Sequence, residues 1–565
     1  MRFVLKPLAL VGAAAVSILF SQGAQASFAG LAGAAKADRN ATLTRLETSY
    51  PKTLNPIIFS TATEADIILD YNVFETLVAM DPDTGKAACW LCTTYEYSPD
   101  KKVVTFKLRK DVKFHDGKPL TAQDVKFSFD VMVNPKVDNL NNKSDVMAAV
   151  AKVEAPDDYT VKITFKKAKY SNIYQIGVPV IPKHLFPYFA AHPEQFNKDQ
   201  KFGRHPIGSG PYKFVKWEGD QFVEIERNDD WWGFKSHDPR FKNDFNFKRI
   251  RFKIITNDNV ALQAFKKGEF DYTDLASYQY DQLSKEKSPT LKVKTLHLEP
   301  KVGTSFMFIG WNTRLPMFSD VKTREALELL THRQATLAKF SKGLRPPTNG
   351  PWGINSPYQC PKEQCPVAPF DPAKAKKLLA EAGWKDTNAD GCLDRTVKGK
   401  MQTLRFSILT DETDWSKNVL MVYATDMKKA GVCVTLRQLD WTAMQKLVDD
   451  LNFQAYLSGW QSGYPILPRQ LWYSGNTGKT GSNTTGFKDK VADQLIDQFE
   501  SEFDDQKRIE IGRKLHKRIY DAHTMLWHHE GGGCYMGINK SLQGVEVADY
   551  QATCIYWPRW YKEKK

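Results

Sequence analysis

The sequence predicts a mixed α/β protein that is built from several blocks of strands and helices. Three observations support this class: runs with period-two alternation, helices marked by capping residues, and the absence of any repeated βα unit, low-complexity tract or flexible linker. The chain has 565 residues, of which 42% are hydrophobic, which is enough to build large cores. At about 100–200 residues per domain, we expect about three or four closely packed units.

Four segments show the alternation of strands. Apolar residues alternate with polar ones at Val104–Leu108 and at Val161–Phe165, and the first run is followed by a turn at His115–Gly117. Residues 212–226 read as a hairpin that turns at Glu218–Asp220. Ile250–Ile254 forms a further strand.

Four helices are indicated by their ends. Thr121–Asp124 resembles a capping box at a helix start, and Asp320 precedes an apolar pattern over 321–327. Asp371 and Pro372 open a helix that Gly383 closes, and another helix runs from Asp258 to Gly268.

Charge and hydropathy exclude two broad classes of protein. There are 79 Lys and Arg against 65 Asp and Glu, a net charge of +14, but the signs are interleaved and form no dense basic stripe. We therefore expect no nucleic-acid partner. The mean hydropathy of −0.46 excludes a polytopic membrane protein.

The N-terminus has the pattern of a secretory signal. Arg2 and Lys6 precede an apolar run of 13 residues, Leu8–Phe20, and residues 21–26 are small or polar and end in A-x-A. A membrane-spanning helix needs about 20 apolar residues. We expect cleavage after Ala26 and an exported protein that does not span the membrane.

Eight cysteines agree with export, because an even number in an oxidising compartment indicates disulfides. Spacing favours the local pairs Cys360–Cys365 and Cys534–Cys554. Cys89 and Cys92 are interpreted as a disulfide, in preference to a redox pair or half a zinc site. Cys392 and Cys433 complete the set.

Searches for catalytic motifs exclude the common nucleophile and nucleotide sites. The chain has no G-x-S-x-G elbow, and Tyr473 stands where a P-loop ending at Gly478–Thr480 needs its first glycine. His528-His529-Glu530 is followed by glycines, not by the spacing of a zinc helix, so a strand or turn at a domain crossing is preferred. We expect a protein without catalysis and without a cofactor.

One loop has the spacing of oxygen-bearing residues that is typical of a calcium-binding loop. Its oxygen-bearing residues are Asp386, Asn388, Asp390 and Asp394. The twelfth position, which needs a bidentate glutamate, is Val397. A metal-free Asx loop is favoured, and calcium binding is the alternative.

The remaining signal is aromatic. Residues 458–465 place Trp460 and Tyr464 among glycine, serine and glutamine. Aromatic faces beside free backbone donors suit a pocket for an organic ligand.

Four ordered blocks resemble one known family. They are Thr53–Pro56 with Val73–Leu77, Thr105–Arg109 through Phe114–Val125, Ile207–Phe214, and Trp311–Thr313 with Val321–Leu327. Together they resemble the extracellular solute-binding proteins of the dipeptide/oligopeptide ABC-transporter family. The resemblance covers nearly the whole chain after the signal segment.

The resemblance implies a two-lobed periplasmic-binding-protein (flytrap) fold with an extra subdomain inserted in the first lobe. The expected limits are 27–72, 205–303 and 531–565 for lobe I, 73–204 for the inserted subdomain and 304–530 for lobe II. It also implies a periplasmic monomer that traps a ligand between the lobes and delivers it to an ABC permease in the inner membrane.

The chain departs from the family at Gly463, where peptide-binding members carry an aspartate for the α-ammonium. Either another acid serves, with Glu64 and Asp66 as candidates, or the ligand has no free amine. Peptide is preferred. Oligosaccharides, opine-like compounds and metal chelates stay open, and an exported hydrolase is a distant alternative. The expected ligand-binding residues are Thr61, Ala62, Thr63 and Glu64 in lobe I, and Gly459, Trp460, Gln461 and Ser462 in lobe II.

Overall fold

The computed structural model describes residues 36–564 except 60–61, 139–142, 237, 242, 289, 300–301, 303–304, 354, 398, 462–466, 478–480, 532 and 551–553. The expected signal segment, with its cleavage site at Ala26, lies outside the described residues. None of the described helices has the length and apolarity needed to span a bilayer.

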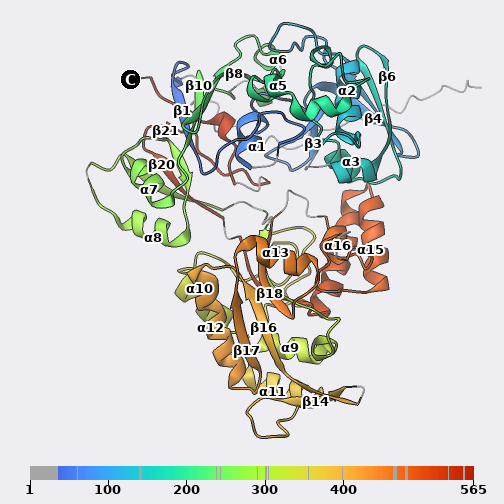
Figure 1. Ribbon diagram of the computed structural model, residues 1–565, viewed down its shortest axis with the longest axis vertical. Coiled ribbons are helices and arrows are strands. Elements are labelled where there is room, and N and C mark those ends of the chain that lie inside the picture. Colours follow the sequence, from blue (N-terminus) through green and yellow to red (C-terminus); the bar gives the residue numbers. More distant parts are fainter. Residues whose placement is uncertain are drawn as a thin grey trace, which may run out of the picture.

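Three main sheets organise the chain, and we name the bodies after them (Figure 1). Lobe I holds a seven-stranded sheet, ordered β12-β20-β11-β1-β10-β9-β8. Its strands are β1 (Thr42–Glu47), β8 (Tyr212–Glu218), β9 (Phe222–Arg227), β10 (Arg249–Ile254), β11 (Tyr272–Asp274), β12 (Val293–Leu298) and β20 (Cys534–Asn539). The inserted subdomain holds the order β4-β5-β7-β6, with strands β4 (Cys92–Tyr97), β5 (Val103–Leu108), β6 (Val150–Asp157) and β7 (Thr160–Phe165).

Lobe II holds a five-stranded sheet, ordered β17-β16-β18-β13-β19. Its strands are β13 (Ser305–Trp311), β16 (Arg405–Thr410), β17 (Cys433–Gln438), β18 (Ala455–Gln461) and β19 (Met525–Glu530). Three two-stranded pairs complete the strands: β2 (Val78–Met80) with β3 (Ala87–Cys89), β14 (Asp394–Val397) with β15 (Lys400–Thr403), and β21 (Leu542–Gln543) with β22 (Tyr561–Lys562).

Helices flank these sheets. Lobe I and the inserted subdomain carry α1 (Ala62–Ile68), α2 (Ala122–Val133), α3 (Lys143–Ala149), α4 (Asn172–Gln175), α5 (Gln200–Arg204), α6 (Trp232–Lys235), α7 (Asp258–Lys266) and α8 (Ser277–Lys285). Lobe II carries α9 (Val321–Leu329), α10 (Arg333–Phe340), α11 (Pro372–Glu381), α12 (Asp414–Lys428), α13 (Trp441–Asp449), α14 (Arg469–Trp472), α15 (Lys490–Ser501) and α16 (Asp505–Asp521).

The strands and helices predicted from alternation and capping are all present. Residues 212–227 form the antiparallel hairpin β8–β9. The side chains of Asp320 and Asp371 accept backbone N–H bonds at the starts of α9 and α11. Gly268 and Gly383 follow α7 and α11 with positive φ, the left-handed conformation that a terminating glycine adopts at low cost.

Buried side chains fill both faces of the lobe II sheet. One cluster joins Trp311 and Phe406 to helices α9–α12, and another joins Phe306 and Trp527 to α15 and α16. A separate large cluster runs without interruption from the lobe I sheet into the inserted subdomain. Lobe II is therefore a complete helix–sheet–helix body, while the inserted subdomain shares its core with lobe I.

The chain passes between the lobes twice. β12 pairs with β20 in lobe I, and the following strand β13 pairs with β19 in lobe II, so the crossings lie between Leu298 and Ser305 and between Glu530 and Cys534. A third contact joins the inserted subdomain to α15, where Lys169 Nζ lies 2.6 Å from a Glu500 carboxylate oxygen. The domain limits expected from the resemblance stay a prediction at the level of single residues.

All eight cysteines form disulfides. The pairs Cys89–Cys92, Cys360–Cys365 and Cys534–Cys554 confirm the local pairings predicted from spacing. Cys392–Cys433 is the fourth pair, and it ties the aspartate-rich loop to the start of β17.

Candidate functional site: a pocket at the strand ends of lobe II

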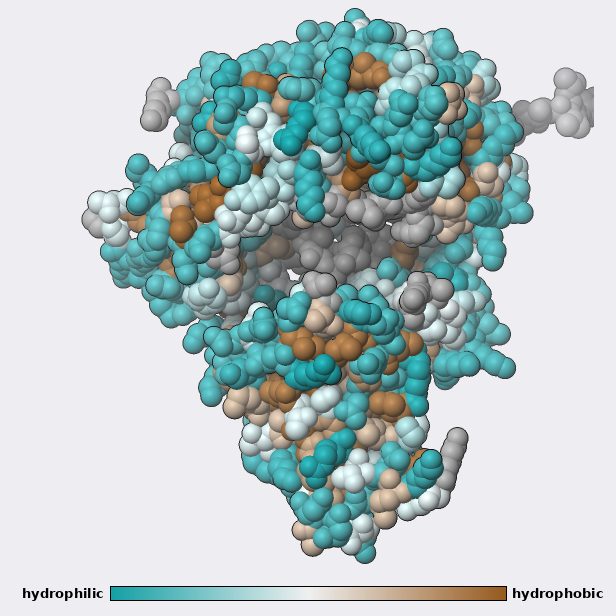
Figure 2. All heavy atoms as spheres, viewed as in Figure 1, coloured by the Kyte–Doolittle hydropathy of each residue, from teal (hydrophilic) through white to brown (hydrophobic). Residues whose placement is uncertain are grey.

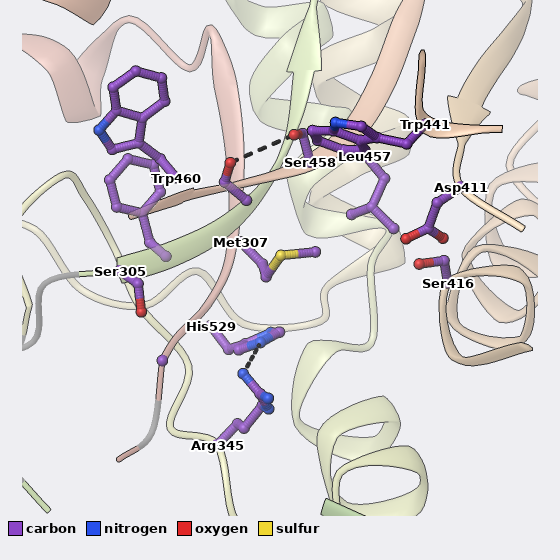
Figure 3. A pocket seen from close by; sticks show the side chains of 13 residues that line it. Ser305, Met307, Arg345, Asp411, Ser416, Trp441, Leu457, Ser458, Trp460 and His529 are labelled. Carbon is purple, nitrogen blue, oxygen red and sulfur yellow. Dashed lines mark hydrogen bonds between the residues drawn. The ribbon is translucent and has the colours of Figure 1, made fainter. Parts of the chain in front are cut away.

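A pocket of about 370 Å³ opens at one edge of the lobe II sheet (Figure 3). Its walls come from β13, β18 and β19, from the starts of α12 and α13, and from the loop that carries Arg345. In the space-filling view, a hollow separates the upper and lower bodies, and apolar surface lies on the lower body beneath it (Figure 2).

The topology of the sheet explains why the pocket lies at this edge. β16 is parallel to β17 and β18, while β13 is antiparallel to β18 and β19. Four strands therefore end at one edge and β13 begins there, with Ser305 paired to Gln461. In open α/β sheets, ligands bind outside the carboxyl ends of the strands, because the loops and helix starts that follow those ends converge there.

One wall of the pocket is aromatic and apolar. Trp441, the first residue of α13, is 57% exposed, a large fraction for an indole in the free protein. Trp460 and Met307 come from the neighbouring strands β18 and β13 (Figure 3). A Cβ on Gly459 would lie 2.8 Å from the Met307 sulfur, so glycine at this position lets the thioether lie against β18.

The polar groups of the pocket include one cation and one carboxylate. Arg345 donates to His529 Nε2 at 3.3 Å. Asp411, directly after β16, accepts a hydrogen bond from the Thr413 hydroxyl at 2.7 Å. Burial lowers the pKa of His529 well below its usual range, and the neighbouring His528 and Arg345 lower it further, so His529 is neutral.

Comparison with known proteins identifies the family. The model of the bacterial extracellular solute-binding proteins, family 5, middle region, matches residues 86–482. This chain is a member of that family. The resemblance found in the sequence is confirmed, and binding of a solute is the role that the family assigns.

Relatives of this solute-binding protein match most of its length. The oligopeptide-binding protein AppA of Bacillus subtilis is 27% identical over 78% of this chain and 77% of its own. Di/tripeptide-binding protein 3 of Pseudomonas aeruginosa is 24% identical over 90% of this chain and 92% of its own.

Solved structures confirm the two-lobed fold. AppA of Bacillus subtilis, in complex with a nonapeptide, matches with a TM-score of 0.73 at 24% identity, over 94% of this chain and all of AppA. HbpA2 of Haemophilus parasuis matches with a TM-score of 0.75 at 23% identity, over 93% of this chain and all of HbpA2.

Two of the lobe II residues predicted to contact the ligand lie in the pocket. Gly459 and Trp460 line the pocket of the solute-binding protein. Gln461 is the last residue of β18. Ser462 and Gly463 lie outside the described residues.

In lobe I, the selected residues begin helix α1, and Thr61 lies outside the described residues. The Thr63 hydroxyl is 2.7 Å from that of Ser49, and Glu64, which is fully buried, accepts backbone N–H bonds from Lys52 and Thr53. Ala62, the first residue of α1, is exposed. Their contact with a ligand stays a prediction.

Asp66, the second acid considered for a ligand ammonium, lies 3.8 Å from Arg45. Burial raises the pKa of Asp66 to about 6, although Arg45 acts in the opposite direction. Its carboxylate is thus partly committed to a cation of the protein itself.

The side-chain oxygens of the aspartate-rich loop, Asp386–Asp394, accept hydrogen bonds from backbone and side-chain groups of the protein. Asp386 accepts from the N–H groups of Ala389 and Gly391, and Asn388 accepts from that of Asp390. The side chain of Asp394 accepts from the Thr403 and Thr387 hydroxyls. The Asn388 bond closes an Asx turn, and an Asp390 carboxylate oxygen also lies 3.2 Å from the Arg405 guanidinium. The choice between a metal-free loop and a calcium site stays a prediction.

Of the residues that line the pocket, the sequence selected only Gly459 and Trp460 as ligand contacts; among those it missed are Arg345, Asp411, Trp441 and His529. His528 and His529 do lie in a strand at a crossing, as predicted, but their part in the pocket was not foreseen. The position of the two histidines in the sequence could have indicated the pocket, because polar residues at the carboxyl end of a buried strand more often serve a binding site than the core.

Proposed function

We propose that this protein captures short peptides in the periplasm, between its two lobes, and delivers them to an inner-membrane ABC permease. The observation that carries the proposal is the lobe II pocket, which opens at the strand ends beside both crossings. AppA and the Pseudomonas relative, which are named for oligopeptides and di- and tripeptides, support the peptide class.

The proposal includes export with cleavage after Ala26, action as a monomer, and binding without catalysis. Lobe I would consist of residues 27–72, 205–303 and 531–565, with 73–204 inserted, and lobe II of 304–530. Ligand contacts would come from residues 61–64 on one side and 459–462 on the other. Contacts to both lobes favour closure, because only the closed form makes both sets at once.

Asp411 supplies the acid that the chain lacks at Gly463. It lines the pocket, and among the described residues no Lys, Arg or His forms an ion pair with it. A ligand ammonium placed there gains a charge-assisted hydrogen bond, while Glu64 and Asp66 are engaged elsewhere.

The second ligand class to weigh is a metal chelate, because solved relatives include NikZ of Campylobacter jejuni with Ni(L-His) and NikA of Brucella suis with Fe(III)-EDTA. In this chain His529 uses both ring nitrogens, one toward Arg345 and one toward His528. It can coordinate a metal only after losing one of these bonds, which favours peptide.

Native mass spectrometry of the protein isolated from the periplasm tests the proposal. We expect the released ligands to be heterogeneous short peptides, and the mature chain to begin after Ala26 as a monomer. Release of a sugar, an opine-like compound or a chelate would refute the peptide class and leave the fold unaffected.

A titration of the emptied protein completes the test. Trp441 and Trp460 line the pocket, so tripeptides should change the tryptophan fluorescence and saturate it. Mass spectrometry after overnight incubation should recover each peptide intact. Cleaved peptide would contradict the absence of catalysis.

A further inference from the structure

Arg345 lies in the pocket without a counter-charge. Its one hydrogen-bond partner among the described residues is the neutral His529, and no described carboxylate forms an ion pair with it. Arg333, in the same stretch of chain, shows the contrast. It is buried beside Glu328, 3.3 Å away, and donates to the carbonyls of Trp527 and Ala368.

The histidine pair determines how Arg345 is held. A guanidinium has only donors, so His529 Nε2 must accept and the ring proton of His529 lies on Nδ1. That proton points at His528 Nδ1, 2.6 Å away, so the proton of His528 lies on Nε2. The His528 Nε2 atom is buried and has no hydrogen-bond partner, so the chain of bonds ends there.

This pair supports Arg345 without neutralising it. Burial, together with the positive charges of Arg333 and Arg345, lowers the pKa of His528 to about 3. The Trp415 ring meets both imidazoles edge-on, at 5.6 and 5.5 Å between centroids. The imidazoles are thus a rigid, uncharged support, and most donors of the guanidinium stay available.

The surroundings favour an anion at Arg345. Ser416 and Trp441, from the first turns of α12 and α13, line the pocket on the side of Asp411 (Figure 3). Asp411 lies across the pocket from Arg345 (Figure 3) and forms no ion pair with it. A partly buried guanidinium without a carboxylate is costly, and a planar carboxylate can accept two parallel N–H bonds from it.

We propose that Arg345 receives a carboxylate of the bound solute, so that the protein selects solutes with a free carboxylate, such as the C-terminus of a peptide. This inference rests on the proposed function. It makes Arg345 a specificity-determining residue of the lobe II pocket, with His529 as the positioning residue behind it.

The test compares two pools of random tri- to pentapeptides, one with free C-termini and one with C-terminal amides. Both pools compete for the emptied protein, and mass spectrometry identifies the captured peptides. We expect the wild type to prefer free acids by about tenfold or more, because hydrogen bonds to charged groups are the strong ones. Arg345→Gln should reduce this preference below about threefold.

Matched variants separate charge from geometry. Arg437→Gln removes the same charge from an exposed position of β17 and should keep the wild-type preference. Arg345→Lys keeps the charge but loses the two parallel N–H donors of the guanidinium, so its preference for free acids should lie between those of the wild type and Arg345→Gln. A melting temperature close to that of the wild type shows that each variant folds.

Two results overturn the inference while leaving peptide binding intact: equal capture of acids and amides by the wild type, or an undiminished preference in Arg345→Gln. If Arg345→Gln fails to fold, the wild-type comparison alone decides. If the wild type captures neither pool, the proposed peptide-binding function is overturned, and so is the inference that Arg345 binds a peptide carboxylate.

Discussion

Replacing Glu75 with glutamine is expected to remove a pH dependence from the stability of the protein. One Glu75 carboxylate oxygen, Oε1, accepts indole N–H bonds from Trp90, Trp231 and Trp232, each at 2.9 Å. The side chain lies in the large core that lobe I shares with the inserted subdomain.

The magnitude follows from the pKa. Burial raises the pKa of Glu75 from 4.5 to about 7, although the hydrogen bonds from the three indoles lower it. Between these values the folded protein holds the proton more tightly than the unfolded chain. The contribution of Glu75 protonation to the free energy of unfolding is therefore complete below pH 4.5 and is lost as the pH rises through 7. This contribution falls by about 2.5 kcal/mol between pH 5 and pH 8.

Glutamine keeps an oxygen that can accept from the indoles, but it carries no titrating proton. Urea unfolding of both proteins, followed by tryptophan fluorescence at pH 5, 6, 7 and 8, measures the difference in free energy of unfolding. Glu47, whose pKa burial raises to about 8, adds a slope of the same sign, and His528 adds an opposite one. Both slopes are common to the two proteins and cancel in the difference.

We expect the free energy of unfolding of Glu75→Gln, relative to that of the wild type, to increase by about 2.5 kcal/mol when the pH is raised from 5 to 8. Glu75→Leu is the control. It leaves three buried indole donors without an acceptor, at about 1–3 kcal/mol each, and should be destabilised at every pH. A difference between wild type and Glu75→Gln that stays constant with pH would refute the reasoning, because Glu75 would then titrate as it does in the unfolded chain.

Three further predictions concern the pocket and a disulfide. Gly459→Ala should push the Met307 thioether into the pocket and weaken peptide affinity about tenfold by calorimetry, with little change in melting temperature, because a flexible side-chain end can move. An unchanged affinity would place the ligand away from β18. Trp441→Ala should weaken peptide binding by about 1–2 kcal/mol and leave the melting temperature unchanged, since the indole is 57% exposed in the free protein; a large loss of stability would contradict this. Replacing Cys392 and Cys433 with serine should cost about 4 kcal/mol by urea unfolding, because the bridge closes a sequence separation of 41 residues. A loss below about 1 kcal/mol would show that the unfolded chain is already restricted there.

The elements that could be predicted are those whose cause is local. Asp320 and Asp371 were recognised as helix starts because a side-chain oxygen there accepts the N–H group three residues on, as it does in the structure. The hairpin of β8 and β9 was recognised because its strands and its turn are adjacent in sequence. Disulfides of short separation were recognised for the same reason, whereas Cys392–Cys433 was not proposed as a pair.

Arg345 shows why the pocket itself could not be predicted from local pattern. It lies in a loop beside Pro346, and its partner His529 is 184 residues further on. The two meet only because β13 lies between β18 and β19 and brings the end of β19 to the edge where β16 and β18 also end. Residues directly at or after those ends, namely Asp411, Trp460 and His529, all line the pocket. The position of a residue relative to the strand ends is therefore the useful predictor. Once the parallel strands of lobe II are assigned, the polar and aromatic residues at their carboxyl ends should be considered together as candidate pocket residues. Within this family, differences at those ends are where we expect differences in the solute to be encoded.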